Sequence, residues 1–216
     1  MLHRVIRAIV SGLSRLVFRL RIEGREHLPP SGAYVIAPSH RSILDSFFAG
    51  VITTRRVRFM AKKELWDNKL LGRMVEIMGA FPVDRAAGSG AVKAALSVLR
   101  AGEPVVVFPE GTRRRGPVIE DLHEGAAYLA VKMGVPVVPV GVGGSEAILP
   151  SGASIPNLKR VAVLVGEPIE PRPGPSPSRT VDRTEVHRIT EELERSIQEL
   201  FTEAEARAAG RRPSRA

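Results

Sequence analysis

Short apolar runs that alternate with helix-periodic stretches constrain the fold of this sequence more than any other feature. The apolar runs lie at residues 33–37, 57–61, 80–83, 104–108, 137–142 and 161–165. Between them, apolar residues recur at helical spacing over residues 43–52, 65–78, 91–101 and 122–133, and Gly134 marks the end of the last stretch. Alternation of this kind predicts an α/β fold, with a mixed, largely parallel sheet covered by helices.

Four segments are expected along the 216 residues of the chain. An amphipathic helix is expected over residues 1–25, and a single α/β domain follows over residues 26–170. Residues 171–180 are rich in proline and are predicted to be a linker, and residues 181–216 are predicted to form a C-terminal helix with a basic tail.

The N-terminal helix is predicted over residues 2–20. Its apolar side carries Leu2, Val5, Ile6, Ile9, Leu13, Leu16, Val17 and Leu20, and its polar side carries Arg4, Arg7, Ser11, Ser14 and Arg15. Arginines interrupt the apolar run too often for a helix that spans a bilayer. Two interpretations stay open: the helix packs on the domain, or it lies on a membrane surface, which its arginine-rich face favours.

Composition excludes several classes of site. The chain has no cysteine, which excludes disulfides, a cysteine nucleophile and thiolate metal sites, and its five histidines form no metal-binding motif, so no metal is predicted. The net charge of +9 calls for an anionic partner. A nucleic acid is not predicted, because only two tyrosines and one tryptophan are present and no nucleic-acid motif occurs. No dinucleotide or phosphate loop is found, so no cofactor is expected.

The first chemical motif, SHRSILD, lies where the apolar run 33–37 ends and a helix begins. His40 and Asp45 could not pair inside one helix, because five residues place them about 140° apart. We therefore expect His40 in the turn and Asp45 in the first helical turn, where the carboxylate can orient the imidazole as a general base. The alternative is a capping box formed by Ser42 and Asp45, in which the carboxylate has no catalytic role.

Three further motifs follow other strands. The segment GAFPVDR ends in Asp84 and Arg85, which alone would be read as an exposed ion pair. The segment FPEGTRRR places three arginines beside a glycine turn and predicts either a phosphate site or a solvated basic loop. The strand VPVVPVGV carries two prolines, so we expect it at a sheet edge or irregular.

Together, the order and separation of these four motifs resemble the glycerolipid acyltransferase family that includes 1-acylglycerol-3-phosphate acyltransferase. The resemblance covers roughly residues 33–165. Ser39, Arg41 and Arg114 depart from the residues that the family often has, namely Asn, Gln and Ser. Arg41 and Arg114 are expected to add positive charge beside the phosphate pocket, which leaves the identity of the acceptor open.

This resemblance implies acyl transfer from acyl-CoA or an acyl carrier protein to the hydroxyl of a phosphorylated glycerol acceptor, 1-acylglycerol 3-phosphate in the first place. It implies His40 as general base, oriented by Asp45, and no metal or cofactor. The residues implied in substrate binding are Lys62, Arg85, Glu110, Gly111, Thr112 and Arg113. The enzyme would work at an anionic membrane surface on the cytoplasmic face. Alternatives are an acyltransferase for glycerol 3-phosphate or another lysolipid, a thioester hydrolase, and a non-catalytic lipid-binding relative.

Overall fold

A seven-stranded sheet organises the molecule, which is a computed structural model that describes residues 8, 12–77, 79–83, 89–148, 157–172 and 181–211. Its strands are β1 (Arg21–Glu23), β2 (Val35–Pro38), β3 (Arg58–Lys62), β4 (Ala80–Val83), β5 (Val105–Val106), β6 (Val137–Gly143) and β7 (Ala162–Val165). The helices are α2 (Asp45–Gly50), α3 (Lys69–Ile77), α4 (Ser89–Arg100), α5 (Gly125–Met133) and α6 (Arg183–Ala208), with short 3-10 helices η1 (Arg25–His27) and η2 (Lys63–Trp66).

The order of the strands across the sheet is β1-β7-β6-β2-β5-β3-β4. Strands β2 to β6 pair in parallel, β7 runs antiparallel to β6, and β1 pairs in parallel with β7. The predicted mixed, largely parallel sheet is confirmed, and each of the six predicted strands is present. Strand β1 was not predicted, because three residues that alternate Arg, Ile and Glu give too short a pattern to recognise.

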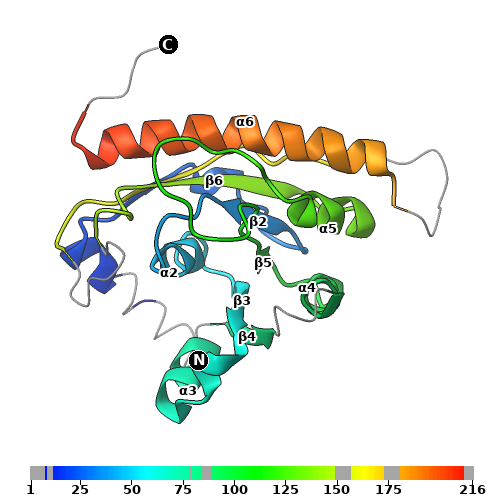
Figure 1. Cartoon of the computed structure of the whole chain (residues 1–216), viewed down its shortest axis with the longest axis horizontal. Helices are drawn as coiled ribbons and strands as arrows, with labels where there is room; N and C mark the ends of the chain where they lie inside the picture. The colour runs from blue at the N-terminus through cyan, green and yellow to red at the C-terminus, as the bar shows by residue number, and fades with distance from the viewer. Residues whose placement is uncertain are drawn as a thin grey trace.

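Helices cover both faces of the sheet (Figure 1). On one face, α4, α5 and α6 pack in a single apolar cluster against Val35, Val105 and Val137. On the other face, α2 and the N-terminal segment pack against the alternate residues of the same strands, such as Ile36 and Val138. The alternation of side chains along each strand explains this division, because successive residues point to opposite faces.

Of the two alternatives predicted for the proline-bearing strand, an edge position or an irregular strand, the second is found. Strand β6 lies in the interior of the sheet, between β7 and β2, and not at an edge. Its pairing is irregular: Val165 and Ile169 are four positions apart in the chain, but their partners Val140 and Val137 are only three positions apart. Pro139 lies in this irregular stretch, and its carbonyl still accepts a hydrogen bond of 2.9 Å from the amide of Gly166. A bulge-like shift therefore accommodates the missing N–H.

Two glycines of β6 allow α6 to cross the sheet closely. A Cβ at Gly141 would lie 2.3 Å from the carbonyl carbon of Leu200, and one at Gly143 would lie 2.2 Å from that of Ala204. On α6, buried apolar residues recur at helical spacing at Val186, Ile189, Leu193, Ile197, Phe201 and Ala204. The helix predicted for the C-terminal segment is thus confirmed, and it forms part of the same core as the sheet.

The N-terminal segment differs in part from the expected helix. Residue 8 and residues 12–17 are helical, and the other positions before residue 12 lie outside the described residues. The helix ends at residue 17 and not at residue 20, because residues 18–23 turn toward the sheet and Arg21–Glu23 pair with β7. Leu13 and Leu16 are 57% and 80% exposed. No helix in the described ranges is long and apolar enough to cross a membrane.

Candidate active site

Three of the predicted site residues, His40, Asp45 and Glu110, come together at the carboxyl edge of the parallel strands. His40 lies in the turn that follows β2, Asp45 is the first residue of α2, and Glu110 lies in the turn after β5, the neighbour of β2. Ligand sites of open α/β sheets form at this edge, because loops from adjacent strands converge there.

The side chains of His40 and Asp45 pair as the spacing predicted. Nδ1 of His40 lies 3.2 Å from Oδ2 of Asp45. The carboxylate of Asp45 is fully buried, whereas the side chain of His40 is 13% exposed. A carboxylate can only accept, so Nδ1 is assigned the proton and Nε2 carries the lone pair. No hydrogen bond from another described residue reaches Nε2, so this nitrogen is available to a substrate.

Asp45 also organises the turn. Its Oδ2 accepts hydrogen bonds of 2.6 Å from the backbone amides of Arg41 and Ser42. The bond from the amide of Ser42 is one half of the capping box. The other half is missing, because the hydroxyl of Ser42 accepts a hydrogen bond of 3.4 Å from the amide of Leu44 and not from the amide of Asp45. The two interpretations of Asp45 are therefore not exclusive, because one oxygen fixes the turn and orients the imidazole.

Arg41 and Glu110 form a fully buried ion pair behind His40, with 0% exposure of either side chain. The other carboxylate oxygen of Glu110 accepts a hydrogen bond of 2.7 Å from the backbone amide of His40. Arg41 also donates to the carbonyls of Gly116 at 3.1 Å and Val118 at 2.8 Å. The expectation that Arg41 adds positive charge to the phosphate pocket is wrong, because Glu110 and these carbonyls enclose its guanidinium.

Glu110 itself was expected to hold the substrate. Both of its oxygens bind inside the protein, one to Arg41 and one to His40, and the residue is 0% exposed. This placement favours a positioning role over direct contact with a ligand.

Phe108 and Ser39 were not among the predicted site residues. The ring of Phe108 stacks on the imidazole of His40, with centroids 3.9 Å apart and an angle of 24° between the planes. The hydroxyl of Ser39 accepts a hydrogen bond of 2.9 Å from the amide of Val142, which ties the end of β2 to β6. Each is the first residue of one of the sequence motifs, but its role could not be predicted because the contacts join residues that are distant in the chain.

The loop after Glu110 lies against the catalytic turn. The amide of Arg114 donates to the carbonyl of His40 at 3.0 Å. Gly111 has φ +67, and a Cβ there would lie 2.5 Å from the ring of His123, so only glycine fits. Thr112 and Arg113 are exposed, and the guanidinium of Arg113 forms no hydrogen bond or ion pair with any residue in the described ranges. This loop, whose backbone contacts His40 through Arg114, therefore carries a cation that no described residue neutralises.

Two predicted binding residues are only partly placed. Lys62 is the last residue of β3 and pairs in register with Val83 of β4, so its backbone reaches the same edge of the sheet. Arg85 lies outside the described residues. Their proposed roles in substrate binding stay predictions.

Comparisons with known proteins identify the family to which the chain belongs. Residues 19–143 match the family model described as Acyltransferase. The chain is 32% identical over 187 residues to the 1-acyl-sn-glycerol-3-phosphate acyltransferase of Bacillus subtilis, which covers 84% of this chain and 91% of that protein. It is 31% identical over 173 residues to a chloroplastic 1-acyl-sn-glycerol-3-phosphate acyltransferase of Arabidopsis thaliana, over 77% of this chain but only 48% of the relative.

A solved structure has the same fold. The crystal structure of the 1-acyl-sn-glycerophosphate acyltransferase PlsC from Thermotoga maritima matches with a TM-score of 0.75 and 24% identity, over 92% of this chain and 79% of that one. The family match, the similarity to the Bacillus subtilis protein and the shared fold lead to one conclusion. The chain belongs to the acyltransferase family, among the glycerolipid O-acyltransferases related to the 1-acyl-sn-glycerol-3-phosphate acyltransferases.

Proposed function

We propose that the protein transfers a fatty acyl group from an acyl thioester to the free hydroxyl of 1-acylglycerol 3-phosphate, with His40 as general base. The observation that carries the proposal is the contact of 3.2 Å between Nδ1 of His40 and Oδ2 of Asp45, which leaves Nε2 without a partner among the described residues. The names of the Bacillus subtilis and Arabidopsis thaliana relatives support this acceptor.

The reaction balances without a covalent enzyme intermediate. The acceptor hydroxyl gives its proton to Nε2 of His40 while its oxygen forms a bond to the thioester carbonyl carbon. The tetrahedral intermediate then collapses, the carbon–sulfur bond breaks, and the imidazolium returns the proton to the leaving thiolate. Asp45 stabilises the imidazolium between these steps, and burial of the carboxylate strengthens that interaction.

Phosphate binding would position the hydroxyl. Arg113 is exposed in the loop whose next residue, Arg114, donates its amide to His40. A guanidinium matches the geometry of phosphate oxygens, and fixing the acceptor this way can lower the barrier by several kcal/mol. Lys62 and Arg85 are proposed to assist from the ends of the neighbouring strands.

Docking on an anionic membrane surface is part of the proposal, because the acceptor is an amphiphile. Leu13 and Leu16 on the N-terminal helix and Ile43 in the catalytic turn are 57%, 80% and 50% exposed. Phe18, just after the helix, contacts Phe48 of α2 edge to face at 5.9 Å, so the helix adjoins the element that begins with Asp45. Replacing both leucines by glutamine should release the protein from vesicles but preserve turnover on a short-chain soluble acceptor.

An assay with purified full-length protein tests the chemistry. The protein is incubated with radiolabelled acyl-CoA or acyl carrier protein and with 1-acylglycerol 3-phosphate, glycerol 3-phosphate or no acceptor. We expect labelled phosphatidic acid that depends on the acceptor and disappears in His40→Ala. Release of free fatty acid at the same rate without acceptor would instead identify a thioester hydrolase, and unchanged transfer by His40→Ala would refute the role of the imidazole.

A further inference from the structure

A second basic site lies apart from the catalytic turn. A cavity of about 470 Å³ opens where the N-terminal segment, the residues before β7 and the end of α6 meet. Its charged lining consists of Arg19, Arg21, Arg160, Arg207, Arg211 and Glu23. The volume lies in the range of small-ligand sites, roughly 300–1,000 Å³. The acyl-transfer mechanism uses none of these residues.

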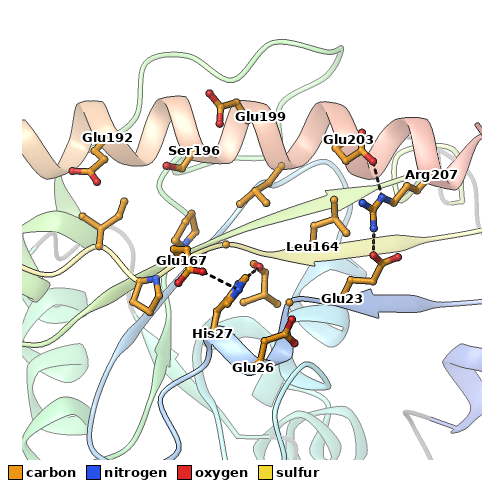
Figure 2. Close-up of a pocket in the computed structure, with 17 residues that line it drawn as sticks. Glu23, Glu26, His27, Leu164, Glu167, Glu192, Ser196, Glu199, Glu203 and Arg207 are labelled. Carbon is orange, nitrogen blue, oxygen red and sulfur yellow. Dashed lines mark hydrogen bonds and ion pairs between the residues drawn. The ribbon is translucent and has the colours of Figure 1, made fainter. Parts of the chain in front are cut away.

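The positive charges in this cavity are not balanced. Arg207 is held between two carboxylates, since it donates to Glu23 and, at 2.7 Å, to Glu203 (Figure 2). The remaining arginines have no side-chain hydrogen bond or ion pair with any residue that the structure describes, and they are Arg19, Arg21, Arg160 and Arg211. We call these four residues the arginine pocket. Like charges gathered without a counter-charge favour an anionic ligand.

Backbone contacts fix the pocket in place. Phe18 accepts a hydrogen bond of 3.0 Å from the amide of Val161, and Arg21 donates one of 3.0 Å to the carbonyl of Val161. Between them, Arg19 has φ 45, which few residues other than glycine adopt. The guanidinium of Arg160 packs beside Gly210, where an added Cβ would lie 3.2 Å from Nη1. The arginines are therefore brought together by the fold before any ligand binds.

The arginine pocket opens on the same edge of the sheet as the active site. Ala162 at the start of β7 pairs with Gly143 at the carboxyl end of β6, and Arg21 pairs with Ala162. Strand β1 lies three strands from β2, so the pocket is about 14 Å along this edge from His40. Leu158, two residues before Arg160, is 77% exposed. An exposed leucine thus lies close in the chain to an unpaired arginine of the pocket.

The opposite side of Arg207 has the opposite charge. There, a groove beneath α6 runs along β7 away from the catalytic edge, and Glu26, Glu167, Glu192 and Glu199 line it (Figure 2). An anionic surface would attract the arginine pocket and repel this groove. The distribution of charge therefore orients the carboxyl edge of the sheet toward such a surface.

We propose that the arginine pocket binds the phosphate headgroup of an anionic phospholipid in the bilayer, as a site separate from the acceptor site at His40. Guanidinium groups bind phosphate oxygens in bidentate geometry, and the exposed side chain of Leu158 would enter the apolar boundary of the leaflet. The inference rests on the membrane docking proposed above, but not on the acyl-transfer chemistry.

The test measures vesicle binding by full-length protein without an acyl donor. Vesicles of phosphatidylcholine, with and without added phosphatidylglycerol, are titrated against wild type, R160Q/R211Q and a matched control, R100Q/R195Q. The control removes the same charge from exposed positions on α4 and α6 outside the pocket. Loss of each pocket arginine should weaken binding to anionic vesicles about fivefold, and of both about 25-fold. Binding to phosphatidylcholine alone should not change.

Each other outcome overturns the proposal. Equal losses of affinity for anionic vesicles in the two double variants would mean that binding depends only on the overall positive charge of the protein. Undiminished binding of R160Q/R211Q would exclude the pocket. A pocket-dependent affinity for inorganic phosphate, without an effect on anionic vesicles, would assign a soluble ligand instead. Equal melting temperatures of the variants establish that they fold. Binding of L13Q/L16Q to phosphatidylcholine vesicles measures the contribution of the N-terminal helix by itself. A failure of membrane docking is thereby distinguished from a failure of the arginine pocket.

Discussion

Arg41 and Glu110 neutralise each other in the interior, 69 residues apart in the chain, and Glu110 also binds the backbone amide of His40. The pair joins the turn after β2 to the turn after β5, so two of the sequence motifs are one structural unit. Removing one partner would leave the other charge buried without compensation.

The charge of this pair can be tested by R41Q, E110Q and the double variant. Each single substitution should lower the free energy of unfolding by about 3–5 kcal/mol, because a lone buried charge remains. R41Q/E110Q should recover most of that loss, since no charge is then left unpaired. Urea denaturation of the four proteins gives the coupling free energy, and strictly additive losses would contradict a direct pair.

Asp45→Asn should affect both turnover and stability, because Oδ2 serves the imidazole and two backbone amides. We expect kcat to fall about 100-fold or more as the tautomer of His40 is lost. The free energy of unfolding should fall by about 1 kcal/mol, as for a lost helix cap. Loss of stability with normal turnover would leave Asp45 a capping residue only. His40→Ala is the matched variant, in which turnover disappears and stability changes little.

The structural features that could be predicted from the sequence are those that depend on a local pattern of residues. Six strands, the terminal helix and the pairing of His40 with Asp45 followed from periodicity and a spacing of five residues. The burial of Arg41 could not be predicted, because its partner Glu110 reaches it only through the pairing of β2 with β5. The interior position of Pro139 likewise depends on a shift of register with the chain around Gly166, which no local signal contains.

Arg113→Gln should weaken binding of the phosphorylated acceptor and leave the donor unaffected. A charge-assisted hydrogen bond contributes about 1.5–3 kcal/mol, so KM for 1-acylglycerol 3-phosphate should rise about 10-fold or more. KM for acyl-CoA should stay within twofold, roughly the scatter of exposed substitutions. Monoacylglycerol, which lacks the phosphate, is the control acceptor, and both proteins should acylate it equally slowly. Equal effects on the two KM values would count against phosphate binding.

Glu185 at the start of α6 gives the fold a dependence on acid. Its hydrogen bonds from the Arg188 side chain, and from the amide of Arg172 at 2.8 Å, lower the pKa of the carboxyl from its ordinary value of 4.5 to about 2. Because the folded state holds the carboxylate charged, this contribution is complete above pH 4.5 and is lost as the pH falls toward 2. It amounts to at most about 3 kcal/mol.

Glu185→Gln should therefore be less stable than wild type at neutral pH, and the two unfolding free energies should converge near pH 2. Glu191→Gln is the control, because this side chain is 64% exposed and, among the residues that the structure describes, pairs only with His187 in the same helix. Urea denaturation from pH 7 to pH 2 measures the three curves. A constant difference between Glu185→Gln and wild type at every pH would mean that the side chain stabilises α6 by packing, and that the ion pair with Arg188 contributes nothing.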